Sequence, residues 1–207
     1  MRAETLDCGF LVLDRSPAAE PWMRLTVFSS SEGLLHCLQR VSSRPTAPAP
    51  PLDLFDEVRA TLETRNQGRT WFIREAAVQR RRSGLGASYA VLAHACRFSR
   101  VLARTPVHQD SRLNVHALLH RALDAWETGL RPDAVYFKCL FLLARDEGFP
   151  VREAWLDTLP DSARATASSI LSRPTADQVA SEAATADLTR RLEEELQRNH
   201  DFVFPVP

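Results

Sequence analysis

Two histidines in this chain have the spacing of metal ligands. His116 and His120 stand four residues apart, so a helix would place both imidazoles on one flank, as it does in zinc enzymes. The residues between them are Ala-Leu-Leu, without the glutamate that a zinc protease needs at this place. Both also border an apolar stripe, where half-buried histidines are common. We therefore expect no metal site here.

Other catalytic patterns are missing from the sequence. It contains neither a GxxxxGKS/T phosphate loop nor a GxSxG nucleophile turn. The stretch GLGAS, residues 84–88, lacks the third glycine of a dinucleotide-binding loop, so we interpret it as a turn. We expect no cofactor and no enzymatic activity. The four cysteines are widely spaced in apolar segments, as is typical of free buried thiols in a reducing cytoplasm: Cys8, Cys37, Cys96 and Cys139.

Arginine clusters in the middle of the chain. Residues 65–112 hold ten arginines against two acids, Glu75 and Asp110, although the formal net charge of the whole chain is zero. Three of them, Arg80 to Arg82, are consecutive. A guanidinium is a planar fork that matches phosphate, and a focused positive field attracts polyanions. The alternative is a set of exposed helix faces balanced by acids nearby in space; we favour a nucleic-acid surface.

Single strands are usually held by a basic groove together with aromatic rings on which the bases stack. A small barrel also needs aromatic side chains in its core, and strand alternation should turn either Trp71 or Phe72 inward. We expect one or two of the candidate rings at most to be exposed. The candidates in the N-terminal part are Trp22, Phe28, Trp71 and Phe72.

The N-terminal part of the sequence alternates short apolar segments with polar turns, the pattern of β-strands. The proline-rich residues 44–51 cannot donate to a sheet ladder and should form a semi-rigid loop. Five short strands favour an OB-type β-barrel, with an SH3-like barrel as the alternative, because closure removes exposed sheet edges. The second half of 52–63 could equally be helical. The expected strands lie within residues 8–13, 23–29, 33–41, 52–63 and 69–79.

From Gly84 onward the apolar residues recur with a helical period. The third helix should begin at Pro132, end at a left-handed cap on Gly148 and lie at the centre, because it is apolar nearly all round. Thr175 and Gln178 should form a capping box for the last helix. The expected helices cover residues 88–103, 113–127, 131–148, 161–172 and 175–200.

Apolar stripes predict which helix faces are buried. The first helix should bury one set of side chains and turn Arg97, Arg100 and Arg104 away. That set is Tyr89, Leu92, Ala93, Cys96 and Leu102. The stripe of the second helix is Val115, Leu118, Leu119, Ala122, Leu123 and Trp126.

These patterns predict an α+β protein with two domains. An N-terminal small five-stranded OB-type barrel would form a nucleic-acid-binding domain over residues 1–83, and an all-α, partner-binding domain without a zinc finger would cover 84–207. At 44% hydrophobic and 25% charged residues, a chain of 207 residues can bury a substantial core. No apolar stretch has the length of a membrane span, and we expect no secretory signal because the first residues lack a basic segment followed by an apolar one. We therefore expect a cytoplasmic protein with no membrane contact.

Several loose motifs follow one another between residues 6 and 151. GFLVLDRSPAAEPWMRLTVFSSSEGLLHCLQRVSSR, residues 9–44, contains an apolar strand, an arginine-containing loop with a glutamate, and a strand ending in Phe-Ser-Ser-Ser-Glu-Gly. PLDLFDEV and WFIREAAV follow as further strands, and a helical stretch closes with Leu143, Gly148 and Pro150. In this order the motifs resemble the RecO family of bacterial recombination and DNA-repair mediators. The matching positions of the opening stretch are Leu13, Arg15, Glu20, Leu25, Phe28, Gly33 and Arg40.

The resemblance implies a non-enzymatic DNA-repair protein with an OB domain and a helical domain. Such a protein binds single- and double-stranded DNA, anneals complementary strands and helps to load RecA, with RecR and single-strand-binding protein as partners. We expect the helical domain to receive the acidic C-terminal tail of single-strand-binding protein, using Arg104, Arg121 and Lys138. The protein would then be cytoplasmic and nucleoid-associated. The candidate DNA-binding residues are Arg15, Arg24, Arg40, Arg44, Arg69, Arg74, Arg80, Arg81 and Arg82.

The chain also departs from the family. The family's Lys-Gly pair before the basic loop is replaced by Arg40 and Val41, and the basic C-terminal tail by NHDFVFPVP. The four-cysteine zinc site that some members carry is missing. The cluster at 65–112 would then carry more of the DNA binding. The alternative is a protein-interaction scaffold with the same fold that has lost DNA binding.

Overall fold

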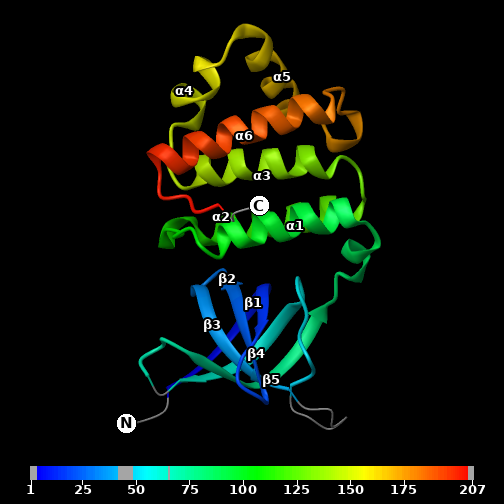
Figure 1. Ribbon diagram of the computed structural model, residues 1–207. Helices are drawn as coiled ribbons and strands as arrows, with labels where there is room; N and C mark the ends of the chain where they lie inside the picture. The colour runs from blue at the N-terminus through cyan, green and yellow to red at the C-terminus, as the bar shows by residue number, and fades with distance from the viewer. Residues whose placement is uncertain (1–3, 42–48, 65, 205–207) are drawn as a thin grey trace. The chain divides into compact units, whose positions relative to one another are not determined.

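The computed structural model describes residues 4–41, 49–64 and 66–204, which form two compact units, Met1–Arg82 and Ser83–Pro207 (Figure 1). The first unit contains a five-stranded sheet and the second contains six α-helices, so the chain is α+β as the sequence predicts. Arg44 and most of the proline-rich stretch lie outside the described residues. No helix in the described ranges is long and apolar enough to cross a membrane.

The five strands form one sheet that closes on itself. Their order is β1-β2-β3-β5-β4, and β4 also pairs with β1. All pairs are antiparallel except β3 with β5, whose parallel contact joins only Cys37 to Trp71 and Leu38 to Phe72. The strands are β1 (Glu4–Pro17), β2 (Trp22–Ser29), β3 (Gly33–Arg40), β4 (Glu57–Thr64) and β5 (Trp71–Arg80).

Alternation of apolar and polar residues explains why these segments form strands with one face inside. In β2, Leu25 and Val27 are fully buried, whereas Arg24, the residue before Leu25, points to the other side and is exposed. Burial raises the pKa of the Cys37 thiol to about 12, so this cysteine is a protonated, free core residue. The closed sheet encloses Cys8, Phe10, Val12, Leu25, Val27, Cys37, Leu52, Val58, Ala60, Leu62 and Ile73.

The expectation for residues 52–63 is only half right. The second half is strand β4 rather than helix, and the first half is a turn in which Leu52 and Phe55 are buried. Phe55 has a positive φ of 64°. Its amide donates to the Val12 carbonyl at 2.9 Å, and the Val12 amide donates to the backbone carbonyl of Asp56 at 3.1 Å. These two bonds to β1 hold the turn against the sheet, which the local sequence does not reveal.

The helical unit is built around α3. This helix contacts α1, α2 and α6, and Figure 1 shows it between α6 and the other two. Pro132 occupies its first turn and Gly148 follows its end with a φ of 86°, both as predicted. The helices are α1 (Tyr89–Leu102), α2 (Arg112–Glu127), α3 (Pro132–Asp146), α4 (Val151–Ala154), α5 (Asp161–Ser172) and α6 (Glu182–Asn199).

The predicted buried face is right for α2 and mostly wrong for α1, where Leu102 is the one member of the predicted set that is buried. All six stripe residues of α2 are buried. In α1, however, Tyr89 is 88% exposed, and Val91, Ala95 and Phe98 are buried instead. Phe98 packs against Trp126 of α2, with ring centroids 6.0 Å apart. Both faces of α1 carry apolar residues, so contact with its neighbours decides which one is buried.

The last helix begins later than predicted. It starts at Glu182, and the Ser181 hydroxyl caps it by accepting from the Ala184 amide at 3.2 Å. Gln178 is not part of a capping box. Its side-chain amide donates to the carbonyls of Ile170 and Arg173, each at 3.0 Å, so it fastens the preceding turn to the end of α5.

A partly buried polar network joins three helices of this unit. The Tyr136 hydroxyl of α3 donates to Glu193 Oε1 of α6 at 2.7 Å, and Arg97 Nη2 of α1 donates to Glu193 Oε2 at 2.6 Å. The guanidinium also lies 5.2 Å from the centroid of the Tyr136 ring. Burial raises the pKa of Glu193, against the opposing effects of Tyr136 and Arg97. The prediction that Arg97 turns away from the core is half right: its side chain is 43% exposed, but Glu193 holds its guanidinium beside the Tyr136 ring.

We expect Tyr136→Phe to lower the free energy of unfolding by about 1–3 kcal/mol, because it removes a hydroxyl donor from a buried carboxylate. Urea unfolding followed by circular dichroism measures this difference. Tyr89→Phe is the matched control, since it deletes the same hydroxyl from a side chain that is 88% exposed. Equal stabilities for the two variants would show that the network does not stabilise the helical unit.

Candidate nucleic-acid interface

The outer face of β2, β3 and the start of β5 carries two aromatic rings in contact. Trp22 and Phe72 meet edge to face, with centroids 5.5 Å apart and an interplanar angle of 77°. Strand alternation turns both outward, because Leu25 and Ile73 on the same strands are buried inside. Each ring is half-buried, so part of its surface is open to solvent.

The other two aromatic candidates do not contribute to this face. Phe28 is fully buried, and Trp71 packs against the enclosed core, as alternation predicts for one of Trp71 and Phe72. Two of the four rings, Trp22 and Phe72, are therefore both outward and partly exposed.

Two arginines flank the aromatic pair. Arg40 lies directly opposite Trp22 in the β2–β3 register, and Arg24 lies opposite Leu38, the β3 residue that pairs with Phe72. Both side chains are exposed, and neither has an ion pair within the residues that the structure describes. Arg69, in the turn before β5, is likewise exposed. Cations beside an aromatic platform are the elements of a single-strand binding surface.

Other predicted DNA-binding arginines are held by acids. Arg74 Nε lies 2.6 Å from Glu63 Oε2, and Arg15 Nη1 lies 2.8 Å from Asp53 Oδ1. Burial alone would raise the pKa of Asp53, but the hydrogen bonds from Arg15 and from the Leu54 amide lower it below its ordinary value. The paired carboxylates offset the charge of Arg15 and Arg74, so these two arginines attract phosphate less than unpaired arginines would.

Arg80, Arg81 and Arg82 do not form one open cationic face. Arg80 ends β5 and is exposed. Arg81 donates to the Pro51 carbonyl at 3.2 Å and lies 3.6 Å from Asp56. Arg82 is only 3% exposed. The expectation is wrong because the three side chains have different surroundings: Arg80 is exposed at the end of β5, Arg81 is held by Pro51 and Asp56, and Arg82 is buried.

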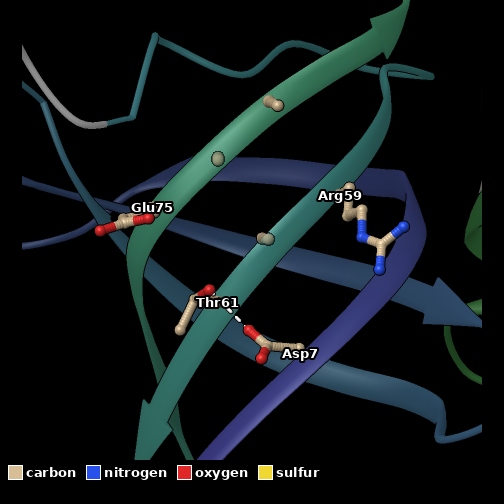
Figure 2. Close-up of a pocket in the computed structure, with 7 residues that line it drawn as sticks. Asp7, Arg59, Thr61 and Glu75 are labelled. Carbon is tan, nitrogen blue, oxygen red and sulfur yellow. Dashed lines mark hydrogen bonds between the residues drawn. The ribbon is translucent and has the colours of Figure 1, made fainter.

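Figure 2 shows a pocket of about 370 Å³ on the outer side of β1, β4 and β5. Thr61 Oγ1 donates to Asp7 Oδ1 at 2.6 Å, and Glu75 points away from Arg59. Two carboxylates against one guanidinium give this surface no attraction for phosphate. It is separate from the Trp22–Phe72 face, and we assign it no part in the interface.

The histidine pair is half-buried on α2. The His116 and His120 rings lie 4.5 Å apart, centroid to centroid. Over residues 4–41, 49–64 and 66–204, the structure contains no group of three or more His, Cys, Asp or Glu side chains that could hold a metal ion.

The helical unit contains a basic groove, and one predicted partner-binding residue lines it. The groove of about 660 Å³ lies among α3, α4 and α5. Its lining includes the apolar residues Phe141, Leu142 and Leu156 and contains no acidic residue. Arg104 and Arg121 are exposed but are not part of its lining. The basic lining residues are Lys138, Arg145, Arg152 and Arg173.

Three of these four basic residues were not predicted from the sequence. Arg145, Arg152 and Arg173 come from the end of α3, from α4 and from the residue after α5, and no periodic pattern links them. The Lys138 ammonium donates to the Arg173 carbonyl, and burial lowers the pKa of Lys138. Arg145 pairs with its neighbour Asp146 at 2.7 Å. The packing of α5 near α3 gathers these charges.

No protein-family model and no curated protein matches this sequence. The residues and their geometry therefore carry the functional argument.

Proposed function

We propose that the N-terminal unit is an OB-type barrel that binds single-stranded DNA on the outer face of β2 and β3. The strand order and the closure of the sheet support this assignment, since OB folds are five-stranded barrels that bind oligonucleotides on the face of their second and third strands and on adjoining loops. The observation that carries the proposal is the Trp22–Phe72 pair between Arg24 and Arg40.

Within this proposal the protein is a non-enzymatic recombination mediator of the RecO type. A cationic, aromatic surface binds strands without covalent chemistry, which is what annealing requires. The basic groove of the helical unit is the proposed binding site for the acidic C-terminal tail of single-strand-binding protein, because its lining combines four basic residues with apolar ones and has no acidic residue. RecR and RecA are the further partners that the family resemblance suggests. Duplex DNA would contact the same arginines through its phosphates.

A salt series tests the electrostatic part of the proposal. We expect affinity for a fluorescein-labelled dT15 oligonucleotide, measured by anisotropy, to fall steeply as salt rises. Arg24→Ala/Arg40→Ala should reduce the slope of log affinity against log salt by about 1.4, since each single-strand phosphate contact contributes about 0.7.

Arg59→Ala/Arg100→Ala is the matched control for this measurement. Both of its arginines are exposed, and neither has an ion pair among the described residues. The control therefore lowers the net charge by the same amount without changing a residue of the proposed face. Equal slopes for the two double variants would exclude the β2–β3 face as the DNA site. The scaffold alternative would be favoured if the wild-type protein showed no salt-dependent binding of the oligonucleotide.

A further inference from the structure

A second feature of the N-terminal unit adjoins the Trp22–Phe72 face. A pocket of about 350 Å³ lies between the β1–β2 turn and the end of β3. Its lining includes Trp22, Val41, Met23 and the small or cyclic residues of the turn, with Glu20 as its one charged residue. The volume falls within the range of about 300–1,000 Å³ typical of ligand clefts.

The backbone groups around this pocket already have partners. The Ala18 amide donates to the Trp22 carbonyl at 3.0 Å, the Trp22 amide to Ala19 at 2.9 Å, and the Val41 amide to Pro21 at 2.8 Å. These bonds tie the turn to both strands, so the walls are positioned before any ligand arrives. The Glu20 carboxylate is exposed and has no hydrogen bond or ion pair in the part of the chain that the structure covers. It is therefore the acceptor that the pocket offers to a ligand.

The charges beside the pocket indicate what the ligand is. Arg40 lies opposite Trp22 in the register, and Arg24 lies two residues further along β2 on the same face. Cations next to an aromatic residue and apolar walls suit a nucleotide. The arginines would contact its phosphates, and the base would enter the pocket. A base can enter only when it is unpaired, so this arrangement favours single strands over duplex.

We propose that this pocket binds one unpaired base and that Glu20 makes it prefer guanine. Guanine presents two adjacent donors, N1–H and the N2 amino group, which match the two oxygens of a carboxylate. Thymine presents a single N3–H between two carbonyl oxygens, which a carboxylate repels. This inference rests on the proposed DNA-binding function and adds a base preference to it.

The test compares labelled dT12 with the same oligonucleotide carrying one central dG. We expect the wild-type protein to bind the dG oligonucleotide at least about fivefold more tightly, since a good bidentate contact to a base discriminates by about 1–3 kcal/mol. Glu20→Gln should remove most of this preference. Glu75→Gln, which deletes an exposed carboxylate elsewhere on the same unit, should retain it.

Replacing the central dG by deoxyinosine, which lacks the N2 amino group, provides a second measurement. The preference over dT12 should then fall in the wild-type protein and stay unchanged in Glu20→Gln. Equal binding of dT12 and the dG oligonucleotide would overturn the base-pocket inference alone and would suit a pocket that takes an apolar peptide side chain. No binding of either oligonucleotide would overturn the proposed function as well.

Discussion

Trp22→Leu and Phe72→Leu should each weaken the binding of dT15 by about 5- to 150-fold, while the fold stays intact. Stacking of a base on an aromatic side chain contributes about 1–3 kcal/mol, and leucine keeps apolar bulk but offers no ring. Both rings face outward and are half-buried, so neither belongs to the enclosed core. This is the largest effect that a single substitution in the N-terminal unit should have on DNA binding.

Fluorescence anisotropy at one fixed salt concentration measures this loss, and thermal unfolding checks that each variant is folded. Tyr89→Leu is the matched control, because it removes an exposed aromatic ring from the helical unit. The salt slope should stay the same in Trp22→Leu, since stacking involves no release of counterions. If both leucine variants bound dT15 with the affinity of the wild type, the DNA would bind at another surface of the protein.

Arg152→Glu should abolish most of the binding of an acidic peptide by the helical unit. The Arg152 side chain is exposed, lines the basic groove and has no ion pair among the described residues. Reversing its charge replaces attraction by repulsion at the rim, which we expect to cost about 1–2 kcal/mol, or about 5- to 30-fold in affinity. A synthetic peptide with four aspartates and a C-terminal phenylalanine, labelled at its N-terminus, is a suitable probe.

The control for this charge reversal is Arg121→Glu. Arg121 is exposed on α2, donates to the Ala117 carbonyl at 3.4 Å and does not line the groove. We expect its substitution to leave peptide binding almost unchanged, and both variants to bind dT15 as the wild type does. A stronger loss in Arg121→Glu than in Arg152→Glu would move the peptide site away from the groove, toward the surface first suggested by Arg104 and Arg121.

Measuring DNA binding and peptide binding separately distinguishes the mediator hypothesis from the scaffold hypothesis. A scaffold that has lost DNA binding would keep the peptide site and show no salt-dependent binding of dT15. A mediator would show both activities, each abolished by its own set of substitutions. The Arg24→Ala/Arg40→Ala and Arg152→Glu variants therefore report on different functions of one chain.

The sequence by itself determined the features that depend on nearest neighbours along the chain. Alternation requires Trp71 and Phe72 to point to opposite sides of the sheet, because successive strand residues alternate, and the structure shows that Phe72 is the outer one. An unbroken apolar stripe predicts the buried face of α2 correctly. Pro132 begins α3 because its ring suits the first helical turn.

Only the tertiary structure decided which distant side chains meet. Ten arginines between residues 65 and 112 suggest one cationic surface, but Glu63 holds Arg74, Glu193 holds Arg97, and Arg82 is buried. The closed sheet, in contrast, brings Trp22 next to Phe72 across fifty positions of sequence, and the helix packing gathers the basic groove. Coulombic attraction and ring contact act over a few ångströms in space, so the fold determines which charges remain available to a ligand.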